Sequence, residues 1–100
     1  MIELVAIAPG RLALRGGLDF GSAVIAHQAG LAFFSQGDTR EWTVDCSGLT
    51  DANSAALAVL LDWLAAMHRS GGKLRYEGLP ERVLAIAEIS EVDELLAAGV

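Results

Sequence analysis

The chain divides into stretches in which apolar and polar residues alternate and stretches in which apolar residues recur at helical spacing. Alternation predicts strands, because successive side chains of a strand point to opposite faces of a sheet. Four strands are predicted, over residues 2–7, 11–14, 42–47 and 73–77. Pro9 and Gly10 form a turn signal that makes the first two strands an antiparallel hairpin, and Gly16 and Gly17 are expected to end it.

Helical spacing predicts four helices, over residues 20–34, 54–69, 80–88 and 91–97. Pro80 is expected to open the third helix, and Ser90 with Asp93 to cap the fourth. Gly71 follows the second helix, where a left-handed residue often ends a helix. A polar loop is predicted over residues 36–40. Because helices and strands alternate, we expect an α/β fold in which helices pack on one face of a mixed sheet of about four strands.

The first two helices differ in how their apolar residues are distributed. In the first, the spacing of Phe20, Val24, His27 or Gln28, and Leu31 predicts the inner stripe, with small and polar residues on the outer side. The second is apolar on nearly every side. Its expected sheet-facing residues are Leu57, Leu60, Leu61, Leu64 and Met67 or His68. Its expected outer residues are Ala55, Ala58, Val59, Asp62, Ala66 and Arg69.

A smooth outer face of small apolar residues favours close approach of another protein. The alternative is that alanine is abundant there because it is the best helix former. Trp63 lies at the border of the two faces, where packing is favoured over a role as an exposed interface anchor.

The junction of the third strand with the second helix is the most informative segment. Asn53 and Ser54 both rank highly as N-cap residues. The free amides of a first helical turn and the helix dipole favour a hydroxyl, carboxylate or phosphate at such a place. We therefore predict a partner-binding site around this junction that continues along the helix. Its residues are Asp51, Asn53, Ser54, Ala55, Ala58 and Asp62.

Composition narrows the function. The 100 residues carry a net charge of −6 and only seven Lys and Arg, which excludes the basic surface that nucleic acid requires. The longest apolar runs, such as residues 55–61, are far shorter than the roughly 20 residues that span a bilayer. The first residues, with Glu3, lack the features of a secretory signal. We expect one soluble, cytoplasmic domain over residues 1–100, without direct insertion into a membrane.

The sequence motifs give little support for a catalytic or metal-binding site. His27 and His68 have no histidine or cysteine partner at metal-ligand spacing, and no P-loop is present, so neither a metal nor a cofactor is expected. Cys46, the only cysteine, lies on a predicted buried strand without a flanking base. Ser54 lacks a nucleophile elbow. An acidic run near the C-terminus favours a solvated face over a docking patch for a basic partner; it consists of Glu88, Glu91, Asp93 and Glu94.

Several segments carry a resemblance to a known family. Residues 45–50 read Asp-Cys-Ser-Gly-Leu-Thr at the end of an apolar strand, and residues 53–57 read Asn-Ser-Ala-Ala-Leu at the head of a helix. Residues 17–20, Gly-Leu-Asp-Phe, and 78–80, Gly-Leu-Pro, add to them. Together with the element order, these segments resemble the STAS domain, which anti-sigma factor antagonists share with some transporter subunits. The resemblance covers nearly the whole chain.

The helix-start motif distinguishes two branches of that family. In the antagonists it reads Asp-Ser-Ser-Gly-Leu and a kinase phosphorylates the second serine, but the matching residue here is Ala55, and Asn53 replaces the acid. In the other branch, the small cytoplasmic subunit of the Mla phospholipid-transport ABC system, the same motif reads Asp-Thr-Ala-Gly-Leu. Ser54 and Ala55 fit that motif, whereas Asn53 and Ala56 depart from it.

The resemblance to the Mla branch implies a non-catalytic subunit that binds the transporter's ATPase and lies at the inner membrane through that partner. An anti-sigma factor antagonist, regulating a sigma factor through an anti-sigma kinase, is the alternative. A small hydrolase using Ser54 or Cys46 is a third interpretation. Self-association is left open.

Overall fold

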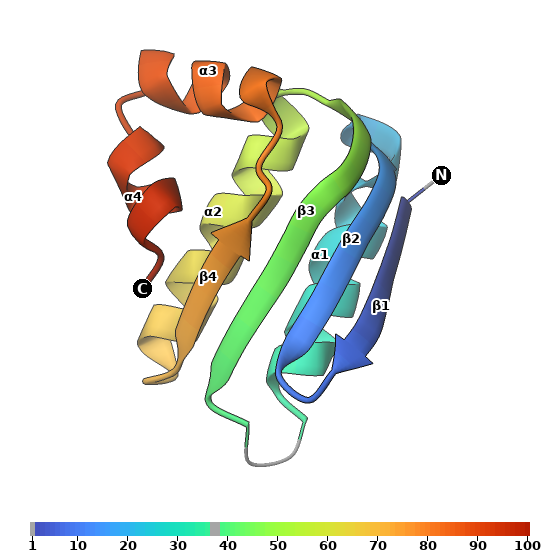
Figure 1. The fold of residues 1–100 in the computed structure, drawn as a ribbon, viewed down its shortest axis with the longest axis vertical. Coiled ribbons are helices and arrows are strands. Elements are labelled where there is room, and N and C mark those ends of the chain that lie inside the picture. Colours follow the sequence, from blue (N-terminus) through green and yellow to red (C-terminus); the bar gives the residue numbers. More distant parts are fainter. Residues whose placement is uncertain (1, 37–38) are drawn as a thin grey trace.

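Four strands form one mixed sheet in the order β1-β2-β3-β4 (Figure 1). The structure is a computed structural model that describes residues 2–36 and 39–100, so residues 37 and 38 of the predicted loop lie outside it. The strands are β1 (Ile2–Ala8), β2 (Arg11–Leu18), β3 (Glu41–Ala52) and β4 (Lys73–Glu77). β1 and β2 are the expected antiparallel hairpin, whereas β2, β3 and β4 are parallel.

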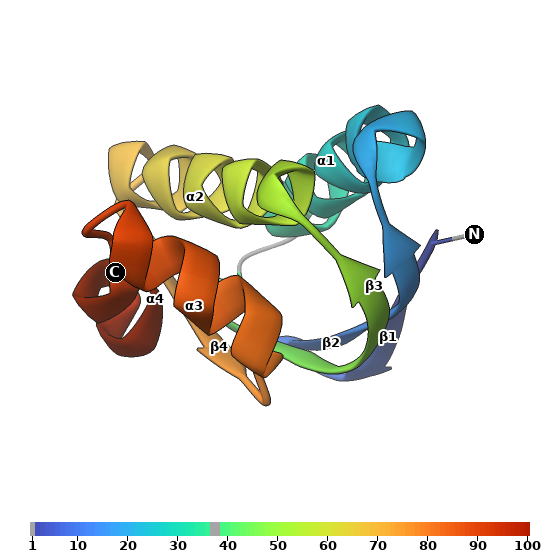
Figure 2. The same cartoon turned by 90° about the horizontal axis from the view of Figure 1, so that it is seen from above.

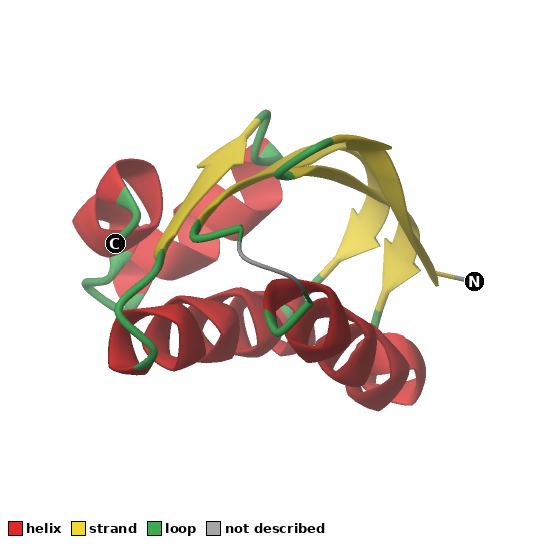
Figure 3. Cartoon of the chain, turned by 90° about the horizontal axis from the view of Figure 1, so that it is seen from below, coloured by secondary structure: helices red, strands yellow, loops and turns green. Residues whose placement is uncertain are grey.

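Helices connect the parallel strands, because a parallel crossover needs a long connection. The helices are α1 (Phe20–Phe34), α2 (Ser54–Arg69), α3 (Glu81–Ile89) and α4 (Asp93–Ala98). Figure 2 shows α1 and α2 side by side on one face of the sheet, and Figure 3 shows the sheet curving over them with α3 and α4 on the side of β4. Among the described residues no element covers the opposite face. The expected fold class, an α/β fold with a mixed sheet of four strands, is confirmed.

Two strands are longer than their patterns predict. Gly16 and Gly17 do not end β2, which continues to Leu18, and β3 continues beyond its polar Ser-Gly segment to Ala52. The extensions pair with each other, with Leu18 opposite Ala52, and register shifts near the glycines accommodate them. Pairing between neighbouring strands therefore overrides the local signal for a break.

The C-terminal helices begin differently from the prediction. Ser90 is the C-cap of α3, and its backbone amide donates to Ile86 O at 3.0 Å. It does not cap the next helix, whose N-cap position is Val92. Glu91 then takes a left-handed conformation with φ 61°, and α4 starts at Asp93 without a side-chain cap. The prediction for Gly71 is confirmed, since it follows α2 with φ 78°.

The core lies between the sheet and the α1–α2 layer, and Trp63 is its largest fully buried side chain. The indole Nε1 donates to the backbone oxygen of His27 at 3.1 Å, and the ring meets Phe34 edge-on with centroids 5.7 Å apart. Trp63 therefore packs in the core and is not an exposed anchor. Tyr76 on β4 makes a similar contact with α2, because its hydroxyl donates to Leu60 O at 2.6 Å.

The first helix is rotated relative to the prediction: of the predicted stripe, Leu31 is half-buried against the core, but Phe20 and Val24 are not. Phe20 and Val24 are 74% and 63% exposed, whereas the buried residues of α1 are Ala26 and Gly30. The cause is Trp63, which occupies the space that a side chain at position 30 would need. Small residues face inward because α2 supplies the large side chain at this contact.

The prediction for the outer face of α2 is also partly wrong. Ala55 and Val59, expected outside, are 4% and 5% exposed, because α1 packs beside them. Ala58 and Asp62 are exposed as expected. Leu61, expected to face the sheet, is only half-buried.

Candidate interaction groove between two helices

A groove of about 340 Å³ runs between α1 and α2 on the helix layer. Its lining from α1 is Phe20, Ala23, Val24, His27 and Gln28, and its lining from α2 is Ser54, Ala55, Ala58, Val59 and Asp62. Four of the six predicted site residues therefore line one groove. Asn53 lies just before α2, and Asp51 is an exposed residue near the end of β3; neither lines the groove.

The start of α2 separates the roles of Asn53 and Ser54. Asn53 has extended backbone angles, and its side-chain oxygen accepts a hydrogen bond from the Ala55 amide at 2.8 Å, so Asn53 is the N-cap. Ser54 is the first helical residue, is exposed, and has no side-chain hydrogen bond within the described part of the chain. Its hydroxyl is thus available at one end of the groove.

The apolar wall that α1 contributes was missed by sequence reasoning. The helical spacing of Phe20 and Val24 predicts that they belong to the inner stripe of α1. The signal that identifies the true inner face is the spacing of Ala23, Ala26 and Gly30, which form a stripe of small residues on one side of the helix. Such a stripe permits a second helix to approach closely and leaves the larger residues at the surface.

Polar groups mark the other part of the groove. His27 Nε2 lies 3.5 Å from Asp62 Oδ2, so this pair bridges α1 and α2. The Asp62 side chain is 70% exposed, and the groove lining contains no Lys or Arg. The groove therefore combines an apolar wall with one acidic group, which suits a partner that is apolar with a basic or donor side chain at that place.

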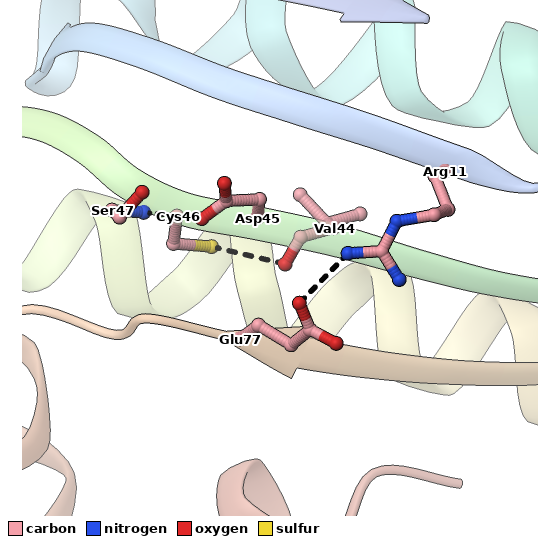
Figure 4. A network of polar contacts seen from close by, with 6 residues as sticks. All are labelled: Arg11, Val44, Asp45, Cys46, Ser47 and Glu77. Carbon is pink, nitrogen blue, oxygen red and sulfur yellow. Dashed lines mark hydrogen bonds and ion pairs between the residues drawn. The ribbon is translucent and has the colours of Figure 1, made fainter. Parts of the chain in front are cut away.

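The third interpretation, a hydrolase, gains no support at Cys46. The side chain is fully buried, and burial, with a smaller effect of Asp45, raises the pKa of its thiol to about 12. A thiol with such a pKa stays protonated near neutral pH and is a poor nucleophile. Its sulfur lies 3.8 Å from the backbone oxygen of Val44, as a weak donor (Figure 4).

The other polar contacts in Figure 4 involve Asp45, Arg11 and Glu77, on the open face of the sheet, opposite to the buried Val44 and Cys46. The Ser47 amide donates to Asp45 Oδ1 at 2.9 Å, which holds the pKa of that carboxyl below its ordinary value. Arg11 on β2 reaches across to Glu77 on β4, with Nη2 and Oε2 2.8 Å apart. An exposed pair of this kind contributes little to stability.

The described residues provide neither a metal site nor a membrane-spanning helix. Residues 2–36 and 39–100 contain no group of three or more His, Cys, Asp or Glu side chains arranged to hold a metal ion. Within the same residues, no helix combines the length and the hydropathy needed to cross a membrane.

Comparison with known proteins bears on the family and the fold. A chain of the Acinetobacter MlaFEDB complex in its ATP-bound Vtrans2 conformation is 34% identical, with a TM-score of 0.75 over 86% of this chain and 90% of that chain. The anti-sigma factor antagonist SpoIIAA in its unphosphorylated form is 13% identical, with a TM-score of 0.65 over 92% of this chain and 83% of that one, which shows the fold alone. No curated protein sequence matches. The family model described as Mlab, STAS domain matches residues 6–97. The chain belongs to the MlaB-type STAS domain family.

Proposed function

We propose that this chain is a non-catalytic subunit of a bacterial phospholipid-transport ABC system, and that it binds the cytoplasmic ATPase subunit through the groove between α1 and α2. The observation that carries the proposal is the groove itself, in which exposed apolar side chains of α1 stand beside Ser54, whose hydroxyl has no hydrogen bond to residues 2–36 or 39–100. The match to a chain of the MlaFEDB complex supports the type of assembly.

The exposed apolar residues are the driving force for this contact. Phe20 and Val24, which line the groove on consecutive turns of α1, are each more than 60% exposed, and so is Ile25 next to Val24, outside the groove lining. Large apolar side chains that gather on one surface favour burial against a partner, with about 25 cal/mol gained per Å² of apolar area removed from water. On the α2 side of the groove, the side chain of Ala58 is small. A side chain inserted by the partner can therefore reach the buried Ala55 and Val59, which form the floor of the groove.

Polar residues give the contact its orientation. Ser54 is exposed at the first position of α2 and offers a hydroxyl there, and Asp62 offers a carboxylate two turns along the same helix. A partner element lying along α2 meets both groups. The subunit contributes no chemistry of its own, and its location is cytoplasmic, at the inner membrane, through the ATPase.

The anti-sigma factor antagonist is the weaker candidate. The position that carries the phosphoacceptor in that branch is Ala55, which lacks a hydroxyl and is 4% exposed. Incubation with ATP and an anti-sigma kinase is expected to leave Ser54 unmodified. A stoichiometric phosphate mapped to Ser54 by mass spectrometry would move the antagonist function ahead of the transporter function.

Hydrogen exchange on the assembled complex tests the proposal. The chain is co-expressed with the ATPase and permease of the Mla-type transporter from its own genome and purified through a tag on the ATPase. We expect the chain to copurify and to gain amide protection at the starts of α1 and α2. Failure to copurify, or protection confined to the open sheet face or to α3 and α4, would contradict the proposal.

A further inference from the structure

The groove between α1 and α2 has its charged groups at one end only. Phe20 and Ser54 are the first residues of their helices, whereas His27 and Asp62 lie about two turns further along. At a rise of about 1.5 Å per residue, the two ends of the groove are about 12 Å apart. A partner that fills the groove therefore meets an apolar end and an acidic end, two helical turns from each other.

The carboxylate of Asp62 is not paired with a strong cation of its own chain. Its Oδ2 lies 3.5 Å from His27 Nε2, and its side chain is 70% exposed. Within residues 2–36 and 39–100, no lysine or arginine forms an ion pair with it. A partner that covers the apolar groove removes water from this carboxylate, which weakens binding unless the partner supplies a compensating cation. Charge complementarity thus requires a lysine or arginine of the partner at Asp62.

The walls of the groove also restrict the secondary structure of the partner. The backbone groups along α1 and α2 are bonded within the helices, so the walls offer side chains, most of them apolar. An extended segment would leave its own amides and carbonyls unpaired against Val24 and Ala58, at a cost in free energy. A helix pairs its backbone groups internally and presents only side chains to such a groove. A helix is therefore the segment that fits.

We infer that the ATPase places an amphipathic α-helix in this groove and that a lysine or arginine of that helix pairs with Asp62, which makes Asp62 a specificity-determining residue. This inference rests on the proposed function, because it takes the ATPase as the partner. Apolar residues of the helix cover the end at Phe20, and the basic residue lies about seven positions away in its sequence, which is two turns.

The affinity of Asp62 variants for the purified ATPase tests the charge. Asp62→Asn keeps an acceptor oxygen and removes the charge, and it is expected to raise the Kd at least about tenfold. Glu88→Gln removes the same charge from an exposed position of α3 and is expected to bind as wild type. Thermal denaturation verifies that both variants are folded. Equal affinities of Asp62→Asn and wild type would overturn the inference.

A charge exchange tests the partner helix. Hydrogen exchange on the ATPase, with and without the chain, identifies the ATPase segment that gains protection. Each lysine or arginine of that segment is then changed to glutamate. We expect the segment to be helical, Asp62→Lys to bind the wild-type ATPase poorly, and one of the glutamate variants to restore binding to Asp62→Lys. A protected segment that is extended or lacks lysine and arginine, or failure of every exchange to restore binding, would overturn the inference.

The outcome at Ala58 separates failure of this inference from failure of the proposed function. If Ala58→Arg weakens binding and Asp62→Asn does not, the groove holds the ATPase and the pairing at Asp62 is wrong. If neither variant weakens binding, the groove is not the ATPase site, and both the inference and the proposed function fail.

Discussion

The indole of Trp63 on α2 lies against the bare Cα of Gly30 on α1, so closely that a Cβ at position 30 would overlap the ring. The same indole donates its N–H to the backbone oxygen of His27 at 3.1 Å. One tryptophan therefore sets both the separation of the two helices and the position of the groove between them. The large residues of α1 are at the surface as a consequence.

Gly30→Ala tests this contact. An added methyl group forces the ring or the helix to move, at a cost of about 1–3 kcal/mol of stability, which exceeds the roughly 1 kcal/mol that alanine gains over glycine in a helix. We expect a lower midpoint in urea denaturation. Gly21→Ala, on the exposed first turn of the same helix, is the matched control and is expected to be neutral or stabilising. Equal stability of Gly30→Ala and wild type would show that the contact is not tight.

The cap of α2 gives a second prediction. Asn53→Ala removes the acceptor for the Ala55 amide and is expected to cost about 1 kcal/mol of unfolding free energy. Ser54→Ala is expected to change stability by less than about 0.5 kcal/mol, because the side chain is exposed and has no hydrogen bond among the described residues. Thermal denaturation of both variants checks this. The reverse order would identify Ser54 as the cap.

The affinity of the same serine variants for the ATPase gives a third prediction. Ser54→Ala is expected to weaken binding through loss of the hydroxyl, and Ser54→Glu is expected to weaken it further, because it adds an unpaired charge to a desolvated surface. Calorimetric titration measures both. If Ser54→Ala binds as tightly as wild type, the hydroxyl does not take part in the interface.

Acid sensitivity gives a fourth prediction. The Ser22 amide donates to Asp19 at 3.0 Å and the Ser47 amide to Asp45 at 2.9 Å, and each bond lowers the pKa of the carboxyl that accepts it. A lowered folded-state pKa contributes stability above the unfolded value of about 3.9, and this stability is lost as the pH falls through the folded value. The double variant Asp19→Asn, Asp45→Asn should therefore lose less stability than wild type on acidification below about pH 4. Parallel losses in urea denaturation would contradict this.

Much of the fold follows from periodicity, because the strand and helix patterns of this chain are strong. The order of the elements and the leucines of α2 that face the sheet were predictable for this reason. The orientation of α1 was not predictable from its own residues. Which face of α1 lies inward depends on Trp63, which is 33 positions after Gly30 in the sequence and packs against it, and not on the size of the residues of α1. The length of β2 was not either, because Gly16 and Gly17 are held in the strand by pairing with β3.

The candidate site was predictable only on α2. Ser54, Ala58 and Asp62 follow one another at intervals of four, which places them on one line of a helix whatever it packs against. Phe20 and Val24 join them only because α1 lies alongside, and that contact depends on the tertiary arrangement.

Binding of the ATPase by an Ala58 variant tests the central claim most directly. Ala58 is exposed in the groove, and Ala65 is exposed on the same helix but lines a different groove, beside α4. Ala58→Arg is expected to raise the Kd at least about tenfold, equivalent to about 1.4 kcal/mol, because it places a large charged group in the apolar centre of the contact. Ala65→Arg should bind as wild type. Unchanged affinity for Ala58→Arg, with both variants folded, would contradict the assignment of this groove to the ATPase.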